Sequence, residues 1–199
     1  MDVLNLYIDF DSTMVDSCTA MGYWYNHAYF FHSDFKPAVG KNIKLWNGRD
    51  ECPLLQNGDI EKIFDSDFFF DVVRPFENAY EVLDRLDKSG KFDLIVCSIG
   101  TYTNISKKLL YIRKYFPMLK QSYMICKDYG SNLKMDKSKI VHDGILLDDH
   151  KSNLISARFP ILFANNGLDK EWNEGYTGKH IVTNWLDFEI LVNNLKPAF

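Results

Sequence analysis

Short apolar runs recur along this chain, and hydrophobic and polar positions do not alternate within them. Runs of this length, rich in Ile, Val and Leu, are typical of strands buried on both faces of a sheet. We expect six such strands, at residues 3–8, 93–97, 122–126, 144–147, 160–164 and 180–183.

The segments between these runs carry hydrophobic residues at helical spacing. One such segment lies between Pro75 and Gly90, which are typical start and stop residues of a helix. A second carries Ile105, Leu109, Ile112 and Phe116. Further helices are expected after Asp149 and over 185–195. The alternation of strand and helix predicts an α/β fold with a doubly wound, parallel, Rossmann-like sheet.

Residues 16–74 interrupt this alternation directly after the first strand. The segment has helical and aromatic-rich patches and loop signals such as Lys36-Pro37 and Asn57-Gly58, but no convincing buried strand. We interpret it as a small helical cap over the mouth of the sheet. The expected domains are therefore an α/β core of residues 1–15 and 75–199 and a cap of residues 16–74.

The overall composition is that of a globular protein, with 46% hydrophobic and 25% charged residues. A net charge of −4 and the lack of any basic block argue against an extended electrostatic interface with polymeric nucleic acid. A small anionic ligand is still compatible with this charge, because a few donors and a metal suffice to bind it. The 15 Phe, 11 Tyr and 4 Trp residues could line a pocket for a flat ligand or simply fill the core.

The four cysteines show no metal-binding spacing, and Cys97 and Cys126 lie inside apolar runs. Free thiols fit a reducing compartment, so we expect a cytoplasmic protein. The first residues run into a strand-like segment without a charged region or a long apolar stretch, so neither a signal peptide nor a membrane span is expected. The sequence leaves a homodimer open.

Two carboxylates, Asp9 and Asp11, follow the first expected strand in the run Asp9-Phe10-Asp11-Ser12-Thr13. Ligands bind at this edge of open α/β sheets. Carboxylates this close repel each other unless a cation or a proton-transfer role holds them. One could attack phosphorus while the other protonates the leaving oxygen. The alternative is an ordinary polar turn.

A second pair, Asp148 and Asp149, ends the fourth expected strand. Because the strands are parallel, this pair should face Asp9 and Asp11 across one edge, and four converging carboxylates would be destabilising without a cation. Hard oxygen ligands of this kind suit Mg²⁺. Asp149 is either a supporting residue behind Asp148 or the cap of the following helix.

The second expected strand ends in Cys97-Ser98-Ile99-Gly100-Thr101, where a hydroxyl and backbone N–H groups before a helix could bind phosphate. A cation is needed opposite that phosphate. Lys137, in Asp136-Lys137-Ser138, is placed for this role, and Lys134 is the competitor.

These motifs, in this order and each after its strand, resemble those of the haloacid dehalogenase-like hydrolase superfamily. The resemblance covers nearly the whole chain. It implies that Asp9 is the nucleophile and Asp11 the general acid and base of a magnesium-dependent phosphatase. It further implies that Ser98, Ile99 and Lys137 bind phosphate, and that Asp148 binds Mg²⁺ with Asp9 and the backbone carbonyl of Asp11.

A narrower resemblance is to the 5′(3′)-deoxyribonucleotidases. It rests on Asp67-Phe68-Phe69-Phe70 before Arg74-Pro75, on the Asp-Lys-Ser run and on Val182-Thr183-Asn184-Trp185. This family hydrolyses nucleoside monophosphates and stacks the base on cap aromatics. The resemblance implies that Phe69 and Trp46 contact the base; packing within the cap is the alternative for both.

The chain departs from the family pattern at several positions. Ser12 stands where the family usually has Gly, Ser98-Ile99-Gly100 replaces Thr-Ser-Pro, and His150 replaces an Arg. The machinery for hydrolysis is intact, but the preferred substrate is open. The rivals are a phosphatase of another small phosphomonoester or of a nucleic-acid 3′-phosphate, and a non-catalytic binding module.

Overall fold

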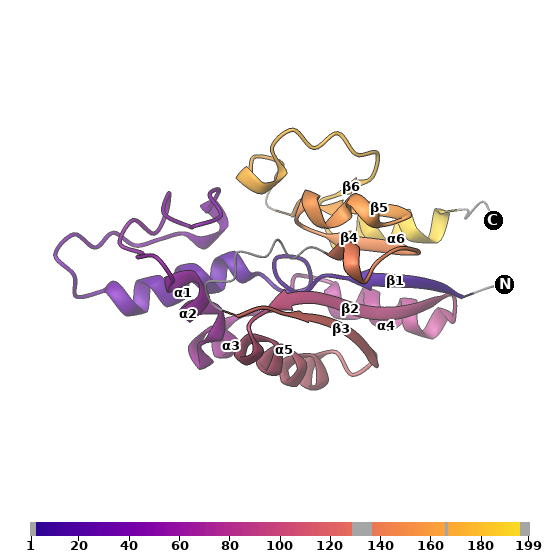
Figure 1. Ribbon diagram of the computed structural model, residues 1–199, viewed down its shortest axis with the longest axis horizontal. Helices are drawn as coiled ribbons and strands as arrows, with labels where there is room; N and C mark the ends of the chain where they lie inside the picture. The colour runs from indigo at the N-terminus through magenta and orange to yellow at the C-terminus, as the bar shows by residue number, and fades with distance from the viewer. Residues whose placement is uncertain (1–2, 129–136, 166, 196–199) are drawn as a thin grey trace.

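Six parallel strands form one sheet in the computed structural model, which describes residues 3–128, 137–165 and 167–195 (Figure 1). Their order is β3-β2-β1-β4-β5-β6. They span Leu4–Ile8 (β1), Phe92–Gly100 (β2), Gln121–Cys126 (β3), Ile145–Asp148 (β4), Phe159–Phe163 (β5) and Ile181–Val182 (β6). The predicted parallel sheet is confirmed, although β2 continues to Gly100 because Ser98, Ile99 and Gly100 stay paired with β3.

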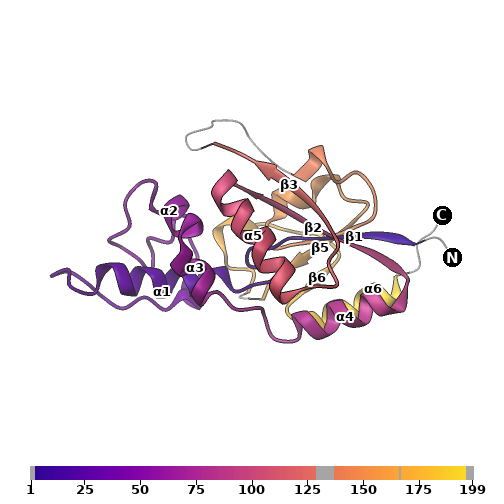
Figure 2. The ribbon, with the colours of Figure 1, turned by 90° about the horizontal axis from the view of Figure 1, so that it is seen from below.

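Alternate residues of strands β1, β2, β4 and β5 enter two different cores. Leu6 and Ile8 face a large core that is closed by helices α4 (Ala79–Ser89), α5 (Tyr102–Tyr115) and α6 (Trp185–Asn194). Figure 2 shows α4 and α6 side by side, and the side chain of Arg85 joins them through two 2.7 Å hydrogen bonds to Glu189. On the opposite face, Tyr7 packs in a smaller core with residues of the 137–157 segment.

The helix expected after Asp149 is a short 3₁₀ helix, Lys151–Ser156. Because β5 already begins at Phe159, the connection has no room for a longer helix. Helices α4, α5 and α6 lie where the sequence predicts them. Among the residues that the structure describes, no helix is both long and apolar enough to cross a membrane.

Residues 16–74 contribute three α-helices, a short 3₁₀ helix (Gly40–Asn42) and no strand of the sheet. The helices are α1 (Ser17–Tyr29), α2 (Asp59–Asp65) and α3 (Asp67–Val72). They gather at one end of the molecule, beyond the carboxyl ends of the strands (Figure 1). The chain enters and leaves this region side by side, because the N–H of Asp16 donates to the carbonyl of Arg74 at 2.9 Å. The segment therefore overhangs the edge where the sequence predicts the site.

Candidate active site

Three carboxylates meet at the carboxyl edge of the sheet. Asp9 follows β1 and Asp148 ends β4, and these strands are neighbours, so their ends come together. One carboxylate oxygen each from Asp9, Asp148 and Asp149 lies within 4.8 Å of the others. Asp9 and Asp148 are buried. A compact set of buried hard oxygen donors is the chemistry that fits a divalent cation such as Mg²⁺.

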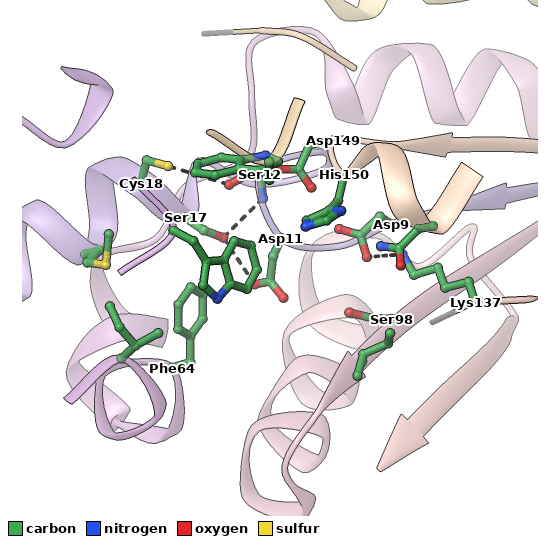
Figure 3. A pocket seen from close by; sticks show the side chains of 16 residues that line it. Asp9, Asp11, Ser12, Ser17, Cys18, Phe64, Ser98, Lys137, Asp149 and His150 are labelled. Atoms are coloured by element: carbon green, nitrogen blue, oxygen red, sulfur yellow. Dashed lines mark hydrogen bonds and ion pairs between the residues drawn. The ribbon is translucent and has the colours of Figure 1, made fainter. Parts of the chain in front are cut away.

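Lys137 lies against this cluster. Its side chain is buried, and its ammonium group donates to Asp9 Oδ1 and to Asp148 Oδ2. Figure 3 shows the lysine reaching Asp9 from the side opposite the cavity aromatics. The structure therefore brings Lys137 to Asp9 and Asp148, and its predicted role opposite the phosphate stays a prediction. Its competitor, Lys134, lies outside the described residues.

Burial dominates the electrostatics of the cluster. It raises the pKa of Asp9 to about 7, although the ammonium of Lys137 acts in the opposite direction. Burial and the charges of Asp148 and Asp9 also raise the pKa of Asp149 well above its ordinary value. For Lys137, burial alone would lower the pKa, but the two neighbouring carboxylates outweigh it and the net shift is upward. One lysine does not neutralise three carboxylates, so the cluster retains capacity for a cation.

The carboxylate of Asp11 lies outside this cluster and faces the cavity. Its Oδ1 accepts from Ser17 Oγ at 3.1 Å, and its Oδ2 accepts from the ammonium of Lys108. The third carboxylate of the cluster therefore comes from Asp149 and not from Asp11. The expected metal contact of Asp11 is through its backbone carbonyl, and it stays a prediction. The next residue, Ser12, has a φ of 53°, a left-handed conformation that explains why glycine is common there in the family it resembles.

Lys108 is a residue of this site that the sequence reasoning missed. Its ammonium group also donates to Ser98 Oγ at 3.0 Å and to the carbonyl of Ile99 at 3.1 Å. Lys108 shares the buried face of α5 with Ile105 and Ile112, whereas Leu109, expected on that face, is 40% exposed. A lysine on the apolar stripe of a helix is the signal that could have identified it.

Ser98 and Ile99, the predicted phosphate binders, both line the cavity above the carboxylates. Ser98 is buried within the end of β2, and its hydroxyl oxygen already accepts from Lys108. Its own O–H is thus available to donate to a ligand in the cavity. The role of Ile99 as a phosphate binder stays a prediction.

The cavity lies between the sheet edge and residues of the 16–74 segment, and its volume is about 130 Å³ (Figure 3). A second cavity of about 150 Å³ shares Asp11, Trp46, Ile60, Phe64 and Ile99 with it, so the two cavities adjoin, and we call them together the groove. Carboxylates and Lys137 line one end of the groove, and aromatic rings line the middle. The groove can accommodate a ligand that is anionic at one end and apolar along its length.

Phe69 does not lie at this groove, and the prediction that it contacts a base is wrong. It is fully buried on α3, with its ring 4.9 Å from that of Phe64 and 5.2 Å from that of Phe70. Phe64, near the end of α2, lines the cavity instead (Figure 3). Packing within the cap, the alternative considered for Phe69, is what the structure shows.

Trp46 does line both parts of the groove, and it is 61% exposed. Its ring contacts His150 and Trp172 edge-on, with centroids 5.5 and 5.6 Å away. Trp172, a further residue that the sequence reasoning missed, donates its indole N–H to Asp149 Oδ2 at 3.1 Å. Asp149 is thereby fixed within the acidic cluster, and no sequence signal links it to a tryptophan 23 residues away.

Comparison with known proteins shows the family of this chain. The model of the family "5′ nucleotidase, deoxy (pyrimidine), cytosolic type C protein" matches residues 3–196. The chain belongs to this family. It is therefore a phosphoric monoester hydrolase of the 5′-nucleotidase type. A search of curated proteins found no match.

Solved structures share the fold of this nucleotidase at low sequence identity. The haloacid dehalogenase-like hydrolase SP0104 from Streptococcus pneumoniae is 13% identical, with a TM-score of 0.63 over 96% of this chain and 98% of that one. A predicted phosphatase from Clostridium acetobutylicum is 14% identical, with a TM-score of 0.64 over 98% and 100%. YfnB from Bacillus subtilis, solved with bound magnesium, is 11% identical, with a TM-score of 0.57 over 97% and 100%.

Proposed function

We propose that this nucleotidase hydrolyses (deoxy)nucleoside monophosphates in a magnesium-dependent reaction through an aspartyl-phosphate on Asp9. The observation that carries the proposal is the groove, in which the acidic cluster and Lys137 adjoin the exposed ring of Trp46 and the half-buried ring of Phe64. A phosphate suits the charged end, and a nucleobase suits the aromatic section. A cytoplasmic location fits the family description and the four free cysteines.

Asp9, Asp148 and Asp149 would hold the magnesium ion, together with the backbone carbonyl of Asp11. When bound, Mg²⁺ offsets the negative charge that the phosphate and the carboxylates bring together. Lys137 holds Asp9 and Asp148 in place and supplies a positive charge at the phosphate oxygens. The Ser98 hydroxyl donates to another of those oxygens.

In the first step, a carboxylate oxygen of Asp9 attacks phosphorus in line with the departing sugar oxygen. The bond from phosphorus to that oxygen breaks, and Asp11 transfers a proton to it, so the nucleoside leaves as a neutral alcohol. In the second step, Asp11 takes a proton from a water molecule, whose oxygen attacks the phosphorus of the acyl phosphate. Inorganic phosphate leaves and the carboxylate of Asp9 is restored.

The substrate proposal is tested with a panel of monophosphates assayed with Mg²⁺ and with EDTA. We expect nucleoside monophosphates to exceed sugar phosphates of similar size in kcat/KM, and EDTA to abolish activity until Mg²⁺ is restored. Ca²⁺ should substitute poorly, because its looser coordination disturbs the alignment of Asp9 with phosphorus. An enzyme that is indifferent to the base would leave a phosphatase of another small phosphomonoester, and full activity in EDTA would refute the metal.

A further inference from the structure

Lys108 is a charged residue on a buried helix face. Its side chain is 1% exposed, and it projects from α5 between Ile105 and Ile112 toward the edge of the sheet. Removing an ammonium group from water is costly unless charges and hydrogen bonds replace the water. Its position therefore depends on the groups that it contacts.

All three N–H donors of Lys108 are engaged within the protein. They are directed to Asp11 Oδ2, to Ser98 Oγ at 3.0 Å and to the carbonyl of Ile99 at 3.1 Å. A lysine has no fourth donor. Lys108 consequently has no hydrogen bond to offer a phosphate oxygen, and it does not line the groove itself. It acts on a ligand only through its partners.

Two of those partners face the groove from different elements. The Asp11 carboxylate is held from both sides, by Ser17 at the start of α1 and by Lys108 on α5. Ser98 Oγ accepts from Lys108, which leaves the hydroxyl hydrogen of Ser98 available to donate into the cavity. A single ammonium group thus fixes a proton-transfer carboxylate relative to a phosphate-binding hydroxyl.

We propose that Lys108 is a positioning residue that aligns Asp11 with the leaving oxygen of a phosphate held by Ser98, an inference that rests on the proposed function. Proton transfer requires its donor within hydrogen-bond reach of the leaving oxygen, and small displacements cost large factors in rate. Removal of Lys108 should therefore harm most those substrates whose leaving oxygen needs a proton.

The test compares kcat/KM of Lys108→Met for a deoxynucleoside 5′-monophosphate and for 4-nitrophenyl phosphate. The sugar alkoxide is a poor leaving group that needs the proton of Asp11, whereas 4-nitrophenolate leaves without one. Since general acid catalysis contributes roughly 10²–10⁴-fold, we expect a loss of about 10- to 100-fold for the nucleotide and a much smaller loss for the aryl ester. The control is Lys114→Met, an exposed lysine on the same helix, which should leave both values unchanged.

Equal losses for the two substrates would overturn the positioning role, since a merely structural or phosphate-binding lysine serves both alike. If Lys108→Met does not fold, Lys108→Gln gives the same comparison and should show the same selective loss, because its shorter side chain has two N–H donors for the three acceptors. A wild-type enzyme that cleaves neither substrate would refute the proposed function, and this inference with it. An active wild type with no selective loss in the variants refutes this inference alone.

Discussion

Asp9 is a carboxylate that is only 6% exposed, and its surroundings set its charge state. Burial raises its pKa from an ordinary 3.8 to about 7, against the pull of Lys137. The folded protein therefore retains a proton that the unfolded chain releases as the pH rises above about 4. The free energy of unfolding therefore falls as the pH rises from one pKa value to the other. Above pH 7 this loss of stability is complete, because the buried carboxylate is then charged.

A bound divalent cation should restore the stability that is lost when Asp9 is deprotonated, because the cation binds the deprotonated carboxylates. We predict that Mg²⁺ raises the melting temperature more near pH 8 than near pH 5. Differential scanning fluorimetry with and without Mg²⁺ at the two pH values measures this. A shift that is equal at both, or absent at the higher pH, would contradict the assignment.

Asp148→Asn provides the matched variant for this measurement. It removes a charge from the acidic cluster while keeping the size of the side chain, so the Mg²⁺-dependent shift should disappear. Asp93→Asn, an exposed position on β2, should keep the full shift. If the Asp148 variant kept it too, the cation would bind elsewhere.

At the scale of the elements, two short helices determine which aromatic ring faces the groove. Phe64 lies near the end of α2, and Phe69 lies on α3 after a break at Ser66, whose hydroxyl caps α3 by accepting from the N–H of Phe69 at 3.1 Å. The break rotates α3, so that Phe69 enters the core while Phe64 faces the groove.

Substitution of these two phenylalanines should have different consequences. Phe64→Ala should reduce the preference for nucleotides over a small aryl phosphate by about 5- to 150-fold in kcat/KM, since stacking on a base contributes roughly 1–3 kcal/mol. Phe69→Ala should instead lower the free energy of unfolding by about 3–5 kcal/mol, as buried Phe-to-Ala substitutions do. Urea unfolding and kinetics on both variants separate the two roles; a reversed pattern would restore Phe69 to the substrate site.

The difference between these residues also shows what the sequence can predict. Asp9 and Asp148 were predictable because parallel strands bring their carboxyl ends to one edge. Phe64 and Lys108 were not, because their orientation depends on where a short helix breaks and on a lysine packed at an apolar position. The sheet follows from local patterns, whereas the groove wall depends on tertiary contacts.

At the scale of the whole molecule, the overhanging segment is joined to the core beside the groove. The loop at 169–172 contacts the segment at 43–46 in several ways. Lys170 donates to the carbonyl of Ile43, Glu171 bonds the backbone of Lys44 and of Trp46, and Trp172 contacts the Trp46 ring. These contacts place Trp46 over the site, so the position of this aromatic ring at the groove depends on the loop at 169–172.

Glu171→Ala tests that dependence. It removes the carboxylate that accepts from the N–H of Trp46 at 2.9 Å, an interaction worth about 1 kcal/mol. We predict that KM for a nucleoside monophosphate rises about 5-fold while kcat changes little, because the acidic cluster is untouched. Steady-state kinetics provide the values, and Glu174→Ala, an exposed neighbour, is the control. A fall in kcat with an unchanged KM would contradict this role.

The covalent intermediate is the central claim, and trapping it is the most direct test. Wild-type enzyme mixed with a ³²P-labelled nucleoside monophosphate and quenched in acid should carry label, and peptide mapping should place it on Asp9. Asp9→Asn should fold normally, take up no label and lose activity by on the order of 10³-fold or more, because an amide is not a nucleophile. Label on another residue, or an Asp9→Asn variant that retains a tenth of the wild-type rate, would contradict the account.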